Sequence, residues 1–145
     1  MYLWLDCETR CPVAPKNGQS EFGIEYAEGW EDYKSMGIAV CCALDSTGLM
    51  RIFGQENIRE LQQVVNYATK IVTYNGERFD FPLLEAHGVI IPKKKSCDLY
   101  AKLKQASGSS FGLAAYAKKN LAVGKTMEGA LAPILWQESL KECDP

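Results

Sequence analysis

Two acidic side chains interrupt the apolar run near the start of the sequence. Residues 2–7 read YLWLDC, and Asp6 is followed two positions later by Glu8. If this run is a strand, residues two apart point to the same face, so the two carboxylates lie side by side. Close carboxylates repel unless one is protonated or a cation lies between them, and such hard oxygen ligands suit Mg²⁺ or Mn²⁺. The alternative is a strand that frays into solvent, and D-x-E alone does not decide between the two.

A second group of polar residues lies in VTYNGERFDFPLL, residues 72–84. The N-G pair at Asn75 is typical of a turn, and Asp80 fits the N-cap position of a helix. A capping carboxylate can still turn one oxygen toward a metal, so Asp80 is also a candidate ligand. Phe79 and Phe81 flank it, and we expect one ring to pack in the core and the other to offer a face to a base.

The elements that would position these residues are strands first and helices later. Three strands joined by short turns, followed by alternating helix and strand, predict an α/β fold with a mixed five-stranded sheet flanked by helices: an antiparallel meander and then parallel strands. In such sheets, sites form at the carboxyl ends of central strands. The expected strands cover 2–7, 36–45, 48–54, 71–75 and the start of 96–105. The expected helices cover 58–70, 79–87, the end of 96–105, 110–121 and 129–142, and 11–33 is expected to be a long loop.

Composition excludes several classes of protein. The length of 145 residues predicts one domain, and a net charge of −2 gives no overall basic field for nucleic acid. Six cysteines without a C-x-x-C pair, and one histidine, do not form a zinc pattern. The lack of a leader and of disulfide spacing predicts a reducing, cytoplasmic location. The Lys93–Lys95 run, with other lysines up to Lys125, is either a solvated surface or a local phosphate-binding patch.

The D-x-E and N-G-x-x-F-D-x-P motifs together resemble the DEDD superfamily of 3′–5′ exonucleases, which have the ribonuclease H-like fold. Within it, the sequence is most similar to proofreading-type exonuclease domains related to family B DNA polymerases. The resemblance extends over nearly the whole sequence, through segments 29–45, 96–105, 111–125 and 129–136. It implies a single ribonuclease H-like exonuclease domain over residues 1–145.

The resemblance also implies a chemistry. Asp6 would bridge two divalent ions, Mg²⁺ or Mn²⁺, while Glu8 would bind one of them and position the attacking water. Asp80 would complete the shell of the second ion. Asn75 and Phe79 would bind the substrate near its 3′ end. The implied partner is single-stranded nucleic acid, with DNA favoured over RNA, although no residue here discriminates a 2′-hydroxyl.

One family motif has no clear counterpart. The last motif, Y-x-x-x-D or H-x-x-x-D, supplies a fourth carboxylate, whereas here Leu140 occupies the aromatic position before Asp144. We therefore expect the domain to be truncated before this motif. Asp98 is the other candidate for a fourth acid, although a helix N-cap is favoured for it. Three functions remain open: an exonuclease, a catalytically impaired module that binds nucleic acid or a partner protein, and another ribonuclease H-like enzyme such as an endonuclease or resolvase.

Overall fold

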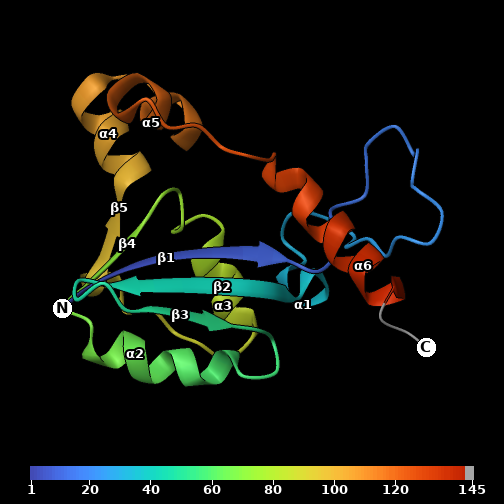
Figure 1. The fold of residues 1–145 in the computed structure, drawn as a ribbon, viewed down its shortest axis with the longest axis horizontal. Coiled ribbons are helices and arrows are strands. Elements are labelled where there is room, and N and C mark those ends of the chain that lie inside the picture. The colour runs from blue at the N-terminus through green and yellow to red at the C-terminus, as the bar shows by residue number, and fades with distance from the viewer. Residues whose placement is uncertain (143–145) are drawn as a thin grey trace.

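The computed structural model of this protein describes residues 1–142 and contains a five-stranded mixed sheet. The strand order is β3-β2-β1-β4-β5, so β1 is central (Figure 1). β1 pairs antiparallel with β2 and parallel with β4, β2 pairs antiparallel with β3, and β4 pairs parallel with β5. The predicted α/β class and mixed sheet are confirmed. The strands are β1 (Tyr2–Thr9), β2 (Ile38–Asp45), β3 (Met50–Phe53), β4 (Lys70–Thr73) and β5 (Ser96–Asp98).

The helices lie close to their predicted positions, with shorter ends. The predicted helix over 58–70 begins as a 3₁₀ turn and ends at Tyr67, because Ala68 adopts an extended conformation and Lys70 starts β4. Residues 11–33 form the expected loop, with one isolated bridge between Val13 and Ala27. The helices are α1 (Tyr33–Met36), η1 (Ile58–Glu60), α2 (Leu61–Tyr67), α3 (Asp80–Ala86), η2 (Lys93–Lys95), α4 (Leu99–Ser107), α5 (Leu113–Leu121), η3 (Gly129–Leu131) and α6 (Ala132–Glu142).

The hydrophobic core lies on one face of the sheet. β1 buries every second residue from Leu3 to Thr9, and the buried apolar side chains among these pack with residues of α2 and α3 such as Leu61 and Leu83. Full burial of a leucine side chain contributes roughly 1.5–3 kcal/mol. This packing fixes which face of β1 points inward, and it therefore directs Asp6 to the other face.

Two separate helical segments follow β5 in the chain (Figure 1). α4 and α5 form an arm that rises from the end of β5, and the chain then crosses to α6 (Figure 1). α6 contacts β1, and Gln137 on α6 donates to the Arg10 carbonyl at 3.0 Å, just beyond the strand. Within residues 1–142, no helix is long and apolar enough to cross a membrane.

Candidate active site

Asp6 and Glu8 lie on the same face of β1, opposite the core. The alternating burial along the strand leaves Asp6 exposed and Glu8 half-buried, while Cys7 between them is buried. The predicted orientation of the pair is therefore found, and the strand does not fray: β1 pairs with β2 through Glu8 to Thr9. Seven residues of β1 have partners in β2, so the backbone that carries both acids is held in place.

Asp80 lies beside this pair but does not cap its helix, which corrects the predicted N-cap. Phe79 occupies the N-cap position, and Asp80 is the first residue of α3. The Phe81 amide donates to the Gly76 carbonyl at 2.8 Å, so the preceding turn already satisfies a donor of the first helical turn. The Asp80 carboxylate instead accepts the Cys7 amide at 3.0 Å. This bond links the start of α3 to β1, between the two other acids.

The three carboxylates share an environment that opposes ionisation. Burial and, second to it, the negative charge of Asp6 together raise the pKa of Asp80 to about 7. Although Asp6 is an exposed residue, partial desolvation by the surrounding protein raises its pKa, and desolvation raises the pKa of Glu8 in the same way, while the positive charge of Lys125 acts in the opposite direction on both. Repulsion among acids with few compensating donors is the electrostatic situation that a bound cation relieves.

The loop that carries Asn75 is held by Asp98. Asn75 adopts a left-handed backbone conformation (φ 66°), and a Cβ on Gly76 would lie 2.5 Å from the Thr73 side chain. Asp98 accepts the amides of Asn75 and Glu77 at 2.9 and 3.2 Å. It also caps α4, as predicted, by accepting two amides of the first turn. These four bonds give Asp98 a structural role rather than that of a fourth metal ligand.

Phe79 and Phe81 both pack against the core, and Phe79 also lines a cavity of about 510 Å³ beside Glu8. The ring of Phe79 meets Trp30 and Tyr33 edge-on, with centroids 6.4 and 6.1 Å apart. Trp30 and Met36 line the same cavity. The largely apolar wall next to Glu8 therefore comes partly from the 11–33 loop, whose role the sequence did not indicate.

The lysine run has a structural role at one position. Lys95 Nζ donates to the carbonyls of Val65 and Asn66 at 3.0 and 2.8 Å, near the C-terminal end of α2. Lys125, far from that run in sequence, lies instead at a cavity that Asp6 also lines. Lys125, which belongs to the predicted lysine patch, is therefore close to the carboxylates in the folded protein.

The donor types at this site fit a hard divalent cation, but a complete metal centre is not assembled. In the part of the chain that the structure describes, no three His, Cys, Asp or Glu side chains lie together closely enough to hold a metal ion. Asp6, Glu8 and Asp80 supply carboxylate oxygens of the kind that Mg²⁺ and Mn²⁺ prefer. Asp144, the other candidate for a fourth acid, lies outside the described residues.

The sheet order and the acids at the end of its central strand define a ribonuclease H-like, nuclease-type fold. The chain belongs to the RNase_H superfamily, whose family model matches residues 47–145. Both findings confirm the resemblance to the fold of DEDD exonucleases that the two motifs indicated.

A solved structure supports the same fold. The family B DNA polymerase from the hyperthermophilic archaeon Pyrobaculum calidifontis superimposes with a TM-score of 0.68 and 16% sequence identity. The match covers 97% of this chain and 21% of the polymerase, so the chain spans about a fifth of that protein's length. No curated protein matches the sequence.

Proposed function

We propose that this protein is a metal-dependent 3′–5′ exonuclease that hydrolyses phosphodiester bonds at the 3′ ends of single strands, DNA rather than RNA. The observation that carries the proposal is that Asp80, 72 to 74 positions later in sequence, lies beside the strand that carries Asp6 and Glu8. The Cys7–Asp80 hydrogen bond holds Asp80 there, although within residues 1–142 the three carboxylates do not close around one ion position. Strongly perturbed carboxylates next to a cavity are a common feature of catalytic sites.

Asp6, Glu8 and Asp80 would hold the divalent ions. When bound, two such ions lower the pKa of a water molecule and neutralise charge on the leaving oxygen. The chain's own residues then orient the reactants. Glu8, which lines the cavity at Phe79, would position the attacking water by accepting a hydrogen bond from it.

Asn75 and Phe79 would bind the end of the strand. The Asn75 side chain belongs to a loop whose backbone is fixed by Asp98, so little ordering is needed when the substrate arrives. Phe79 and Trp30 line an apolar cavity in which a terminal base can stack. The site would thereby select a free end that can enter the cavity.

The test is degradation of a 5′-labelled single-stranded oligonucleotide by the full chain with Mn²⁺. The wild type should produce a ladder that shortens from the 3′ end, and Asp6→Asn should lower the rate by about 1000-fold or more. Glu60→Gln, which changes an exposed acid on η1, is the matched control and should keep the wild-type rate. Equal rates for the wild type and Asp6→Asn would remove Asp6 from the mechanism.

The second candidate is a module that binds nucleic acid without cutting it. It is favoured by the lack of a three-donor metal group among residues 1–142. It predicts salt-sensitive binding in EDTA and no turnover in Mn²⁺, so turnover that Asp6→Asn abolishes would exclude it. Cleavage of circular single-stranded DNA would favour an endonuclease over both, because an exonuclease needs an end.

A further inference from the structure

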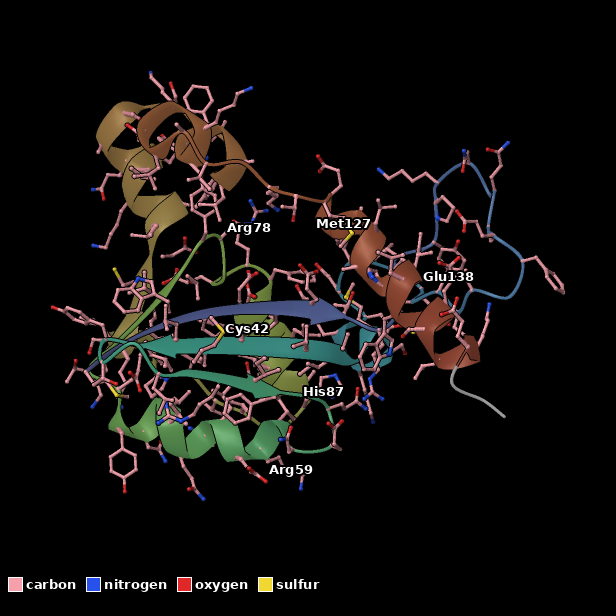
Figure 2. All side chains as sticks on the ribbon, in the orientation of Figure 1. Cys42, Arg59, Arg78, His87, Met127 and Glu138 are labelled. Carbon is pink, nitrogen blue, oxygen red and sulfur yellow. The ribbon has the colours of Figure 1, made fainter. Side chains whose placement is uncertain are left out.

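A second cavity, of about 460 Å³, opens between the carboxyl end of β1 and the arm formed by α4 and α5. Asp6 lines it from β1, and Asn75 and Arg78 line it from the loop before α3. Tyr100 and Phe111 line it from the arm, and Lys125 from the segment after α5. Figure 2 shows Arg78 in the space between the arm and the sheet. The volume is in the usual range for a small-molecule site.

The two cationic side chains of this cavity have no acidic partner. Within residues 1–142, the ion pairs are Arg10–Glu56 and Arg51–Asp45, which leaves Arg78 and Lys125 unpaired. Lys125 is nevertheless close enough to Asp6 to influence that carboxyl group. Two free positive charges beside a carboxylate, on a protein of net charge −2, are suited to holding an anion at this place.

The cavity walls are braced from outside. The Arg78 carbonyl accepts a hydrogen bond from the Tyr33 hydroxyl at 3.2 Å, and Asp98 holds the neighbouring Glu77 amide. On the arm, the Tyr74 hydroxyl donates to the Phe111 carbonyl, and this bond ties the cavity rim to the end of β4. The segments that carry Arg78 and Phe111 are therefore positioned before a ligand arrives.

Aromatic rings form the side of the cavity that the arm supplies. Tyr100 meets Tyr74 edge-on with centroids 5.7 Å apart, and Phe111 meets Tyr116 in the same way at 5.6 Å. Edge-on packing uses the ring edges of one partner and leaves ring faces available for other contacts. Base–aromatic stacking contributes about 1–3 kcal/mol per base and tolerates any sequence.

We propose that this cavity is a subsite for one nucleotide of a single strand, with Arg78 and Lys125 binding its phosphate and with Tyr100 and Phe111 contacting its base. The subsite rests on the proposed function, because it places that phosphate beside Asp6. Arg78 supplies the planar fork that matches phosphate oxygens, and Lys125 supplies a point charge from a separate segment. Neither residue belongs to the exonuclease motifs, and the fold alone brings them together.

The test measures binding in EDTA, so that no metal and no turnover are required. A 5′-fluorescein-labelled ten-residue oligothymidylate is titrated by anisotropy with the full chain from about 50 to 200 mM NaCl. Lys125→Ala and Arg78→Ala should each weaken binding by about 10-fold or more, and each should lower the slope of log K against log salt by about 0.7. Lys16→Ala and Arg59→Ala, which change exposed residues outside the cavity, are matched controls and should change affinity less than about 2-fold.

Tyr100→Leu and Phe111→Leu test the proposed contact of these two rings with the base. Each should weaken binding without changing the salt slope, because no phosphate contact is lost. Free thymidine 5′-monophosphate should compete with the oligonucleotide on the wild type and compete less on Lys125→Ala. Wild-type affinity and slope in both Lys125→Ala and Arg78→Ala would overturn the subsite.

The experiments can contradict the proposed subsite and the proposed exonuclease activity independently of each other. Loss of binding in Lys125→Ala, together with no turnover by the wild type, would support the subsite and contradict the nuclease. Full turnover by the wild type, with unchanged binding by both charge variants, would contradict the subsite alone. Thermal melts of every variant show whether a loss of binding reflects unfolding.

Discussion

Asp98 and Asp80 are both only 5% exposed, but their hydrogen-bond partners and neighbouring charges differ. Asp98, at the end of β5, accepts four backbone amides from the Asn75 loop and from α4. Asp80, at the start of α3, accepts the Cys7 amide and faces the charges of Asp6 and Glu8. Equal burial therefore gives one carboxylate that is fully satisfied and one that resists ionisation.

The comparison shows that the number of hydrogen-bond donors around a buried carboxylate, rather than its burial, distinguishes a structural role from a reactive one. A buried carboxylate costs little when several amide donors replace its hydration, and it then acts as a fixed joint between segments. When the donors are few and neighbouring charges have the same sign, its pKa rises and it becomes available to a proton or a cation. Burial alone would have ranked Asp98 and Asp80 equally as candidate ligands.

The largest expected loss of stability comes from removing the Asp98 carboxylate, which accepts four amides. Asp98→Ala leaves four amides without their acceptor in a partly buried joint, and we expect a loss of roughly 3–5 kcal/mol in the free energy of unfolding. Urea denaturation checks it. Asp80→Ala is the comparison and should cost clearly less, because it also removes like-charge repulsion. A larger loss in Asp80→Ala than in Asp98→Ala would reverse the assignment of the two roles.

The next effect is a pH dependence that Asp80 creates. Its folded pKa of about 7 lies above the usual 3.8, so between these values the folded state holds a proton that the unfolded state has lost. The free energy of unfolding should therefore fall as pH rises from about 4 to about 7, by on the order of 4 kcal/mol, and level off above that range. Urea denaturation in EDTA across this range measures it.

Asp80→Asn is the control for this slope. The amide cannot ionise, so the fall between pH about 4 and about 7 should shrink or vanish. Asp45 does not interfere, because bonds from Thr47 and Arg51 hold its pKa below the usual range, so its contribution is lost only as pH falls below about 4. An unchanged slope in Asp80→Asn would show that another group titrates.

The smallest expected effect on stability concerns two buried threonine hydroxyls, one without and one with a hydrogen-bond partner. Thr73, which pairs with Asp98 in the sheet, is 3% exposed, and its hydroxyl has no hydrogen-bond partner among residues 1–142. Thr73→Val should leave the melting temperature unchanged or raise stability by up to about 1 kcal/mol. Thr9→Val is the matched control and should cost about 0.5–1.5 kcal/mol, because the Thr9 hydroxyl donates to the Cys11 carbonyl at 3.2 Å. Equal losses in both variants would mean that the Thr73 hydroxyl is satisfied after all.

Much of the fold could be predicted because it depends on local periodicity. The alternation along β1 determined that Asp6 and Glu8 share a face, and the order of strands and helices determined the mixed sheet. The end of the 58–70 helix could not be predicted, since pairing of β4 with β1 competes with helix propensity at Lys70. The predicted Asp80 N-cap was wrong because the helix begins one residue earlier: the Leu83 amide donates to the Phe79 carbonyl, and Pro82 has no amide proton to donate.

The sequence by itself determined the types and order of the acids: Asp6 and Glu8 on one strand face, and Asp80 after a turn. Only the tertiary structure decided which carboxylates are satisfied. The four amides on Asp98 come from two segments about 25 residues apart, and the charges around Asp80 come from a strand more than 70 residues earlier. Hydrogen bonds and charges act through space over a few ångströms, so a residue's ionisation depends on neighbours that the chain brings together only when it folds.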